Sequence, residues 1–322
     1  MRVSTNLIYD SGTLGILNNQ AKQLKTYNQI STGRRVVTPE DDPVAAAQVL
    51  VNTQAQQVNT RYMENQGAAK DSLKTVETQL TSTADLLQEV LDRTIQAGNT
   101  TLNDQDRGAI AKDLQVRMDQ LVSIANSQDN NGQYLFSGYQ ATVRPFSVTA
   151  NAGPYNNTNP TVQFNGDQGV RQLQVDASRN MGVTESGVDV FMRVRDRNGN
   201  VSNQSMFDTM QNLINTLNTP VANNAAAAAA LPGAISTALD NLYAAKDNVV
   251  RVRSTVGAKL SELDALTSSS GDIDIQYSET ISNLRDLDYA SAMSDLSKQQ
   301  VQLEAAQKSF KSVTALSLFN LI

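Results

Sequence analysis

The chain has 322 residues, a formal net charge of −6, and neither cysteine nor histidine. Their absence excludes disulfides, thiolate nucleophiles and Ser-His-Asp catalysis, and it removes the commonest general base and transition-metal ligand. Aromatic residues make up only 5% of the chain and no basic face suits nucleic acid, so thin helical layers are expected rather than one thick core or a DNA-binding domain.

The first 35 residues are predicted to form a helix with a coiled-coil seam. Leucines recur in this segment at intervals of seven, three and seven residues, which is the a/d spacing of a coiled coil. The seam residues are Leu7, Leu14, Leu17 and Leu24. Gly33 ends the pattern.

A turn motif follows, made of Gly33, Arg34, Asp41, Asp42 and Pro43. Asp42 is predicted to cap a second helix that has Pro43 at its first position. The paired carboxylates could instead form an acid–base or metal site, but capping is the better interpretation, because carboxylates favour helix N-termini. Arg34 and Arg35 are expected to form salt bridges across the turn to Asp41 and Asp42, each contributing at most about 1 kcal/mol.

Two further helices are predicted, a very long one from about Pro43 and one over about residues 104–126. The long helix carries an apolar seam of Leu73, Val76, Leu80, Leu87 and Leu91. Most globular helices span roughly 8–20 residues, so these lengths favour a rod or bundle.

Residues 141–205 are predicted to form a β-rich insert. Polar and apolar residues alternate over 170–175 and partly over 188–194, and a short apolar run lies at 162–164. The pair Asn198-Gly199 is a strong hairpin signal.

Helix is predicted to resume near Met206 and to break over residues 218–233, where a run of alanines leaves the local state open. The next helix has clear heptads, with Lys259 on the seam as a register residue, and is expected to end at 268–271. The last helix is predicted from about Ile273 to the C-terminus. Its stripe is Tyr289, Leu296, Leu303 and Phe310, at intervals of seven.

The chain is therefore predicted to be mainly α with a β-rich insert, built as a long antiparallel helical rod with its N- and C-terminal helices paired as a coiled coil. The expected domains are 1–40 with 285–322, then 41–140 with 206–284, and the insert 141–205. A pair of terminal helices has little else to pack against, and isolated helices of this kind are marginal. We expect the termini to be weakly ordered alone and to become stable by packing against other copies.

Several segments resemble flagellins and hook-associated proteins, whose shared motif closes the first helix and opens the second. The segments that carry this resemblance are 30–35 with 39–47, 284–290 and 315–320. Two more segments are similar to the members of the family at the hook–filament junction, namely 131–140 and the opening Met1–Thr5. The match covers both ends and the helical body, about three quarters of the chain.

The resemblance implies a structural subunit exported unfolded, without a cleavable signal peptide, to the extracellular flagellum. It also implies four partners: hook-associated protein 1, flagellin, other copies in a ring, and a cytoplasmic export chaperone at the C-terminal helix. The interface residues would be Leu7, Leu14, Leu17, Leu24, Tyr289, Leu296, Leu303, Phe310, Leu316, Leu318 and Phe319. On the residues alone, the 296–310 stripe is better explained as intramolecular core; the resemblance favours a partner surface.

No catalytic residue, cofactor or metal is predicted, and nucleic acid is not an expected partner. Membrane insertion is not expected either, because no apolar run approaches the roughly 20 residues of a membrane span. The nearest alternative is flagellin itself, which shares the two end motifs. A carboxylate-based enzyme in the insert and a generic helical adhesin are the alternatives from other classes.

Overall fold

The computed structural model describes residues 2–129, 131–148, 161–194 and 205–319, with side chains for all of these except 2–6, 8 and 315–319. The chain divides into two compact units. Unit 1 comprises Met1–Thr60 and Gly271–Ile322, and unit 2 comprises Arg61–Ser270. Helices α2 (Pro43–Ala97) and α5 (Ala225–Arg285) each contribute to both units.

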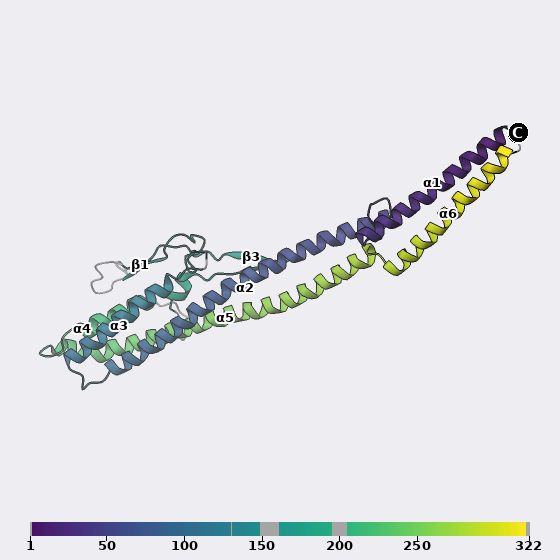
Figure 1. Cartoon of the computed structure of the whole chain (residues 1–322). Coiled ribbons are helices and arrows are strands. Elements are labelled where there is room, and N and C mark those ends of the chain that lie inside the picture. Colours follow the sequence, from purple (N-terminus) through teal and green to yellow (C-terminus); the bar gives the residue numbers. More distant parts are fainter. Residues whose placement is uncertain (1, 130, 149–160, 195–204, 320–322) are drawn as a thin grey trace. The chain divides into compact units, whose positions relative to one another are not determined.

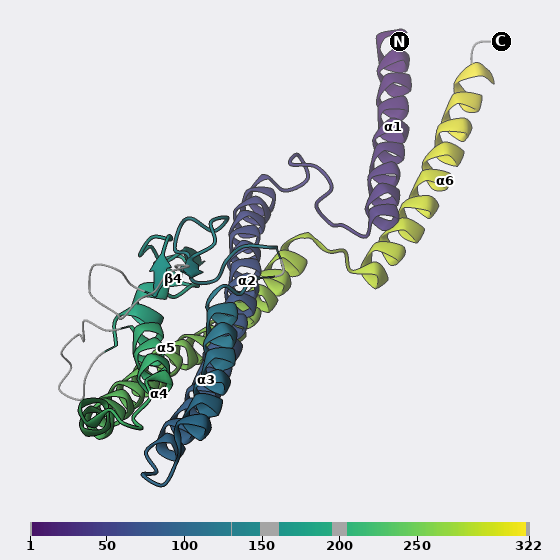
Figure 2. The same cartoon turned by 90° about the vertical axis from the view of Figure 1, so that its left-hand side faces the viewer.

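Unit 1 contains helices α1 (Arg2–Thr32) and α6 (Tyr289–Phe319), which run antiparallel side by side (Figures 1 and 2). The α2 and α5 segments of this unit also pair, since the Gln56 amide donates to the Ser278 hydroxyl at 2.9 Å. The first helix ends at Thr32 because Gly33 takes φ +68°, a left-handed conformation that suits glycine. The antiparallel pair of α1 and α6 confirms the predicted pairing of the terminal helices.

Unit 2 is built on the antiparallel pair of α2 and α5, with α3 (Asp104–Ala125) and α4 (Met206–Asn218) packed together (Figure 1). The predicted seams of the two long helices are confirmed, because they lie in one buried cluster. Its fully buried members include Leu73, Val76, Leu80, Leu87, Leu91, Leu242, Val249, Val256 and Leu263.

The insert holds two antiparallel pairs of short strands. Strands β1 (Phe146–Val148) and β2 (Val162–Phe164) form one pair, and β3 (Gln172–Asp176) and β4 (Arg179–Gly182) form the other. A mainly helical chain with a small β insert is thus confirmed. The predicted Asn198-Gly199 hairpin lies outside the described residues.

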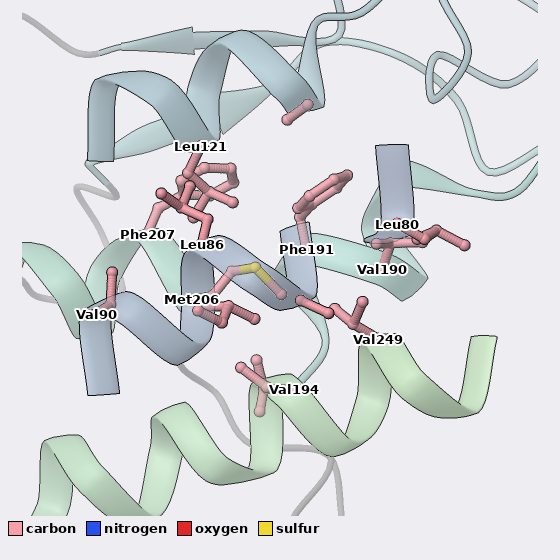
Figure 3. Packing of buried hydrophobic residues seen from close by; sticks show 14 of the residues in the cluster. Leu80, Leu86, Val90, Leu121, Val190, Phe191, Val194, Met206, Phe207 and Val249 are labelled. Carbon is pink, nitrogen blue, oxygen red and sulfur yellow. The ribbon is translucent and has the colours of Figure 1, made fainter. Parts of the chain in front are cut away.

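Aromatic side chains hold the insert to the helices. Five of the seven phenylalanines form one cluster, in which Phe191 makes an edge contact with Phe136 at 5.1 Å between ring centroids. The members are Phe136, Phe146, Phe164, Phe191 and Phe207. Figure 3 shows Phe191 and Phe207 in the same buried cluster as Leu86 of α2. Such pairs contribute roughly 0.5–1.5 kcal/mol beyond their burial.

Polar contacts also fasten the β3–β4 hairpin. Lys259 of α5 pairs with Glu185 at 2.7 Å, and Arg179 pairs with Glu262 of α5 at 2.7 Å. The buried Gln66 amide of α2 donates to the backbone carbonyl of Val175 at 2.8 Å. The seam position of Lys259 thus serves an ion pair to the insert.

Four predictions about individual elements are wrong. Residues 188–194 are not a strand, because Val188–Met192 forms a short π-helix (η1) with Phe191 in the aromatic cluster. The 218–233 break ends earlier than predicted, since α5 already begins at Ala225 and takes in the alanine run. Residues 268–271 do not end a helix, and the last helix does not begin near Ile273: α5 continues to Arg285 and α6 begins at Tyr289. The buried Ser270 hydroxyl accepts from Gln66 of α2 at 3.1 Å, which supports α5 at this point.

Candidate functional site

An elbow in unit 1 joins the end of α1 to the junction between α5 and α6. Three backbone hydrogen bonds make the join: Leu287 N–H donates to the Gly33 carbonyl at 3.1 Å, and the N–H groups of Arg35 and Val36 donate to the Arg285 carbonyl at 2.7 and 3.4 Å. Arg34 and Asp286 form an isolated antiparallel bridge between them. The turn motif thus holds two segments together that lie about 250 residues apart in the chain.

Arg35 links two helix ends through its side chain. Its guanidinium donates to the Leu284 carbonyl at the C-terminus of α5 (2.7 Å) and to the Asp42 carboxylate that caps α2 (3.1 Å). Helix ends leave backbone groups unpaired, so this one side chain stabilises both. The predicted motif named Arg34 and not Arg35, and two adjacent arginines carry no sequence signal that separates their roles.

The paired carboxylates cap and close the turn, as predicted. Asp42 accepts from Ala45 N–H at 3.0 Å, which makes it the N-cap of α2. Asp41 accepts from the backbone N–H groups of Val37 and Thr38, both at 3.0 Å. A hydrogen bond from Lys25 at 2.8 Å, together with those backbone bonds, lowers the pKa of Asp41 to about 2. Asp41 therefore pairs with Lys25 and not with an arginine, while the expected Arg35–Asp42 pair is present.

The face of α1 that lies against α6 mixes small and polar residues with three large ones, Tyr9, Ile16 and Ile30. Its less exposed residues recur at intervals of three and four: Tyr9, Gly12, Ile16, Asn19, Gln23, Thr26 and Ile30. The Phe310 ring covers Gly12 so closely that a Cβ there would lie 2.5 Å from the ring, and Tyr9 meets the ring edge-on at 5.8 Å between centroids. Further along, the Gln299 amide donates to the Thr26 hydroxyl at 3.0 Å.

The predicted leucine seam of α1 lies on a different face of the helix from the closest contacts to α6. Leu7, Leu14, Leu17 and Leu24 are each 59–69% exposed, which leaves four large apolar side chains open along one helix. Leu24 also borders two grooves. One, of about 560 Å³, is lined with Tyr27 and Leu296, and the other, of about 260 Å³, is lined with Val37 and Asp41.

The predicted C-terminal stripe is divided between two environments. Leu296, Leu303 and Phe310 are half-buried on the face of α6 that includes the contacts to α1, whereas Tyr289 is 54% exposed with its hydroxyl close to Gly33. The side chains of Leu316, Leu318 and Phe319 lie outside the described part of the chain.

Further exposed apolar residues were not singled out from the sequence. On the α2 segment of unit 1 these are Val44, Leu50 and Val51, and on α6 they are Met293, Val301 and Val313. These residues lie on the outer faces of their helices, and a single sequence does not distinguish such positions from ordinary surface.

No cluster of three or more acidic side chains that could hold a metal ion occurs among the described residues. Among these same residues no helix is both long and apolar enough to cross a membrane.

Comparisons with known proteins agree with the terminal motifs. Models of the bacterial flagellin N-terminal and C-terminal helical regions match residues 3–141 and 239–322. Flagellar hook-associated protein 3 of Escherichia coli K12 is 35% identical over 100% of this chain and 99% of its own length. The chain belongs to the flagellar hook-associated protein 3 family. A crystal structure of hook-associated protein 3 from Legionella pneumophila shares the fold, with a TM-score of 0.66 and 21% identity over 73% of this chain and 98% of that one.

Membership of this family identifies the chain as a structural component of the flagellum and not an enzyme, which sets aside the predicted enzymatic alternative. Flagellin of Bacillus subtilis is less similar, at 24% identity over 95% of this chain and 94% of its length.

Proposed function

We propose that the chain joins hook to filament, binding hook-associated protein 1 on one side and flagellin on the other in a ring of its own copies. The observation that carries this proposal is the open leucine stripe of α1 in unit 1. Exposed apolar patches of this kind mark interaction sites. The stripe has coiled-coil spacing, which suits contact with helices of neighbouring subunits.

Assembly proceeds by a disorder-to-order transition of the terminal helices. The contact between α1 and α6 has polar or small residues of α1 at Gly12, Asn19, Gln23 and Thr26 among the apolar ones, so only part of it buries apolar surface. Helix pairs of this sort are marginal without further packing. Contacts between copies through the leucine stripe supply that packing, so ordering and binding become one event.

The other expectations form part of the same proposal. Residues 1–40 and 285–322 are the polymerisation helices, 41–140 and 206–284 the helical body, and 141–205 the outer insert. The protein is exported to the extracellular flagellum, after a cytoplasmic export chaperone has bound the C-terminal helix. Gly33, Arg34, Asp41, Asp42 and Pro43 shape the elbow that positions the helices.

The test is seeded assembly of the double variant Leu14→Asp/Leu17→Asp on isolated hooks that carry hook-associated protein 1, followed by flagellin. Because both side chains are exposed, the variant should fold like the wild type by circular dichroism, but it should not form the layer that supports filament growth. Asn18→Asp, at an exposed polar position of the same helix, should assemble normally. A normal layer from the leucine variant would contradict the proposal.

The same assay examines flagellin as the second candidate, which the match to flagellin helical regions favours. A junction subunit forms a thin, self-limiting layer on hooks. Unlimited growth of the protein alone on filament seeds would identify a filament subunit instead.

A further inference from the structure

The chain contains three Asn-Gly pairs, and two of them, 131–132 and 165–166, lie among the described residues. A glycine has no side chain to hinder its backbone nitrogen, so that nitrogen readily attacks the side-chain amide of a preceding asparagine. Asn131 and Asn165 are both exposed, so water reaches both pairs. What differs between the two pairs is their freedom to reach the geometry of that attack.

The pair at 165–166 is held in place. The Asn165 side-chain amide donates to the Ser147 hydroxyl at 2.9 Å, and the Asn165 backbone N–H donates to the Pro145 carbonyl at 2.8 Å. Gly166 is packed so closely that a Cβ there would lie 2.8 Å from the Ser137 carbonyl oxygen. Because the attack needs rotation about the bonds on both sides of the asparagine Cα, these contacts resist it.

The pair at 131–132 has room to move. The Asn131 side-chain amide makes no hydrogen bond to any other described residue. Gly132 takes φ +75° and has no atom within 4 Å of its Cβ position. Its N–H donates to the Asp129 carbonyl at 3.0 Å, but this hydrogen bond lies in an exposed turn. Exposed turns open locally far more often than packed segments, so the attacking nitrogen becomes available.

We propose that Asn131 is a site of spontaneous deamidation in the folded protein. The Gly132 nitrogen forms a bond to Cγ of Asn131, the Cγ–Nδ2 bond breaks, and the former amide proton of Gly132 leaves with Nδ2 as ammonia. Water then opens the resulting imide ring. Opening at one carbonyl gives aspartate, and opening at the other gives isoaspartate, in which the main chain runs through the former side chain. Either product adds one negative charge to the formal −6 of the chain.

The modification changes the turn that begins the 131–140 segment. The Asp129 carboxylate organises this turn, because one of its oxygens accepts from the N–H groups of Asn131 and Gln133 at 2.8 and 2.9 Å. A new carboxylate at position 131 repels that of Asp129. Isoaspartate also lengthens the main chain between the two N–H groups, which then no longer fit the same oxygen. We therefore expect the turn to loosen after deamidation.

The test is to age the folded full-length chain in mildly alkaline buffer and to follow each site by peptide mass spectrometry. Asn131 should deamidate at least about tenfold faster than Asn165, a difference of about 1.4 kcal/mol in activation free energy. The matched control is the same chain in denaturant, where the contacts of Asn165 are absent and both sites should react at comparable rates. Equal rates in the folded chain would overturn the proposal. So would an Asn131 that reacts only in denaturant.

Two variants separate the causes. Ser147→Ala removes the hydroxyl that holds Asn165, so deamidation at Asn165 should rise about fivefold, the effect of one hydrogen bond, while the rate at Asn131 stays the same. Asn131→Gln removes the labile side chain. Amide exchange at Tyr134 and Leu135 should accelerate as the wild type ages but not in Asn131→Gln. Equal acceleration in both proteins would contradict the loosening of the turn, and an unchanged rate at Asn165 in Ser147→Ala would contradict the role given to its hydrogen bond.

Discussion

The close approach of Phe310 to Gly12 gives a sharp test of how the terminal helices pair. A Cβ at Gly12 would lie 2.5 and 2.8 Å from two ring carbons of Phe310, about 1 Å inside ordinary contact. Gly15, in the same helix, has no neighbouring atom within 4 Å of its Cβ position. Alanine at either position gains the same helix propensity of roughly 1 kcal/mol, so the difference between the two variants isolates the clash.

We expect Gly12→Ala to be less stable than Gly15→Ala by about 1–3 kcal/mol, the usual cost of overpacking. The ring of Phe310 is half-buried and can swing aside, but it then loses its edge contact with Tyr9, worth about 0.5–1.5 kcal/mol. Because the ring can relieve the clash in this way, we expect a difference in the lower half of the range, near 1.5 kcal/mol. That difference corresponds to roughly tenfold in an equilibrium constant.

Hydrogen exchange of the α1 and α6 amides is the appropriate assay, because it reports local opening. Exchange should be slower than wild type in Gly15→Ala and about tenfold faster in Gly12→Ala than in Gly15→Ala. Gly12→Ala should lose less protection when Phe310 is already replaced by leucine than when the wild-type ring is present. Equal protection in Gly12→Ala and Gly15→Ala would refute the packing of Phe310 on Gly12.

Two further predictions concern the elbow. Arg35→Lys should speed amide exchange around Asp286 about fivefold, because a lysine lacks the two separate nitrogens with which Arg35 reaches Leu284 and Asp42. Arg34→Lys should change the exchange less, and equal effects of the two variants would contradict the role given to Arg35. The pKa of Asp41 is lowered to about 2 from 3.8, so its contribution to stability is present above about pH 4 and is lost as pH falls through 2. Chemical denaturation of the full chain gives the free energy of unfolding of wild type and of Asp41→Asn. The difference between the two should shrink as the pH falls from about 4 to 2, and a difference that stays constant to pH 2 would contradict the Lys25–Asp41 contact.

The long seams were predictable because sustained apolar heptads leave few alternatives. Leu73, Leu80 and Leu87 recur on one face, and burial of that face is the main source of stability for such helices. The capping role of Asp42 was also predictable, since the residue before a proline at a helix start is a strong local signal.

Other features depend on partners that a single sequence does not identify. An apolar stripe predicts contact, but it does not say with what, so the seam of Leu14 and Leu17 gave no indication that α6 would contact a more polar face. The continuation of α5 through Gly271 is a tertiary effect: a glycine costs a helix about 1 kcal/mol, and pairing with α2 through Ser270 offsets that cost. Alternation over 188–194 had the period of a strand, yet Phe191 is fixed by the aromatic cluster rather than by strand pairing.

The hydrogen bond between Thr26 and Gln299 joins residues 273 positions apart, which has a consequence for the order of folding. Closing a loop of that length from an unfolded chain costs about 5 kcal/mol in entropy, beyond a constant term. The partly polar contact between α1 and α6 does not offset that cost by itself. It forms only after unit 2 has folded and the elbow at Arg35 has brought the two ends of the loop together. The terminal helices are thus the last part of the chain to fold and the first to open, so the insert and core are complete before the two ends are committed to each other.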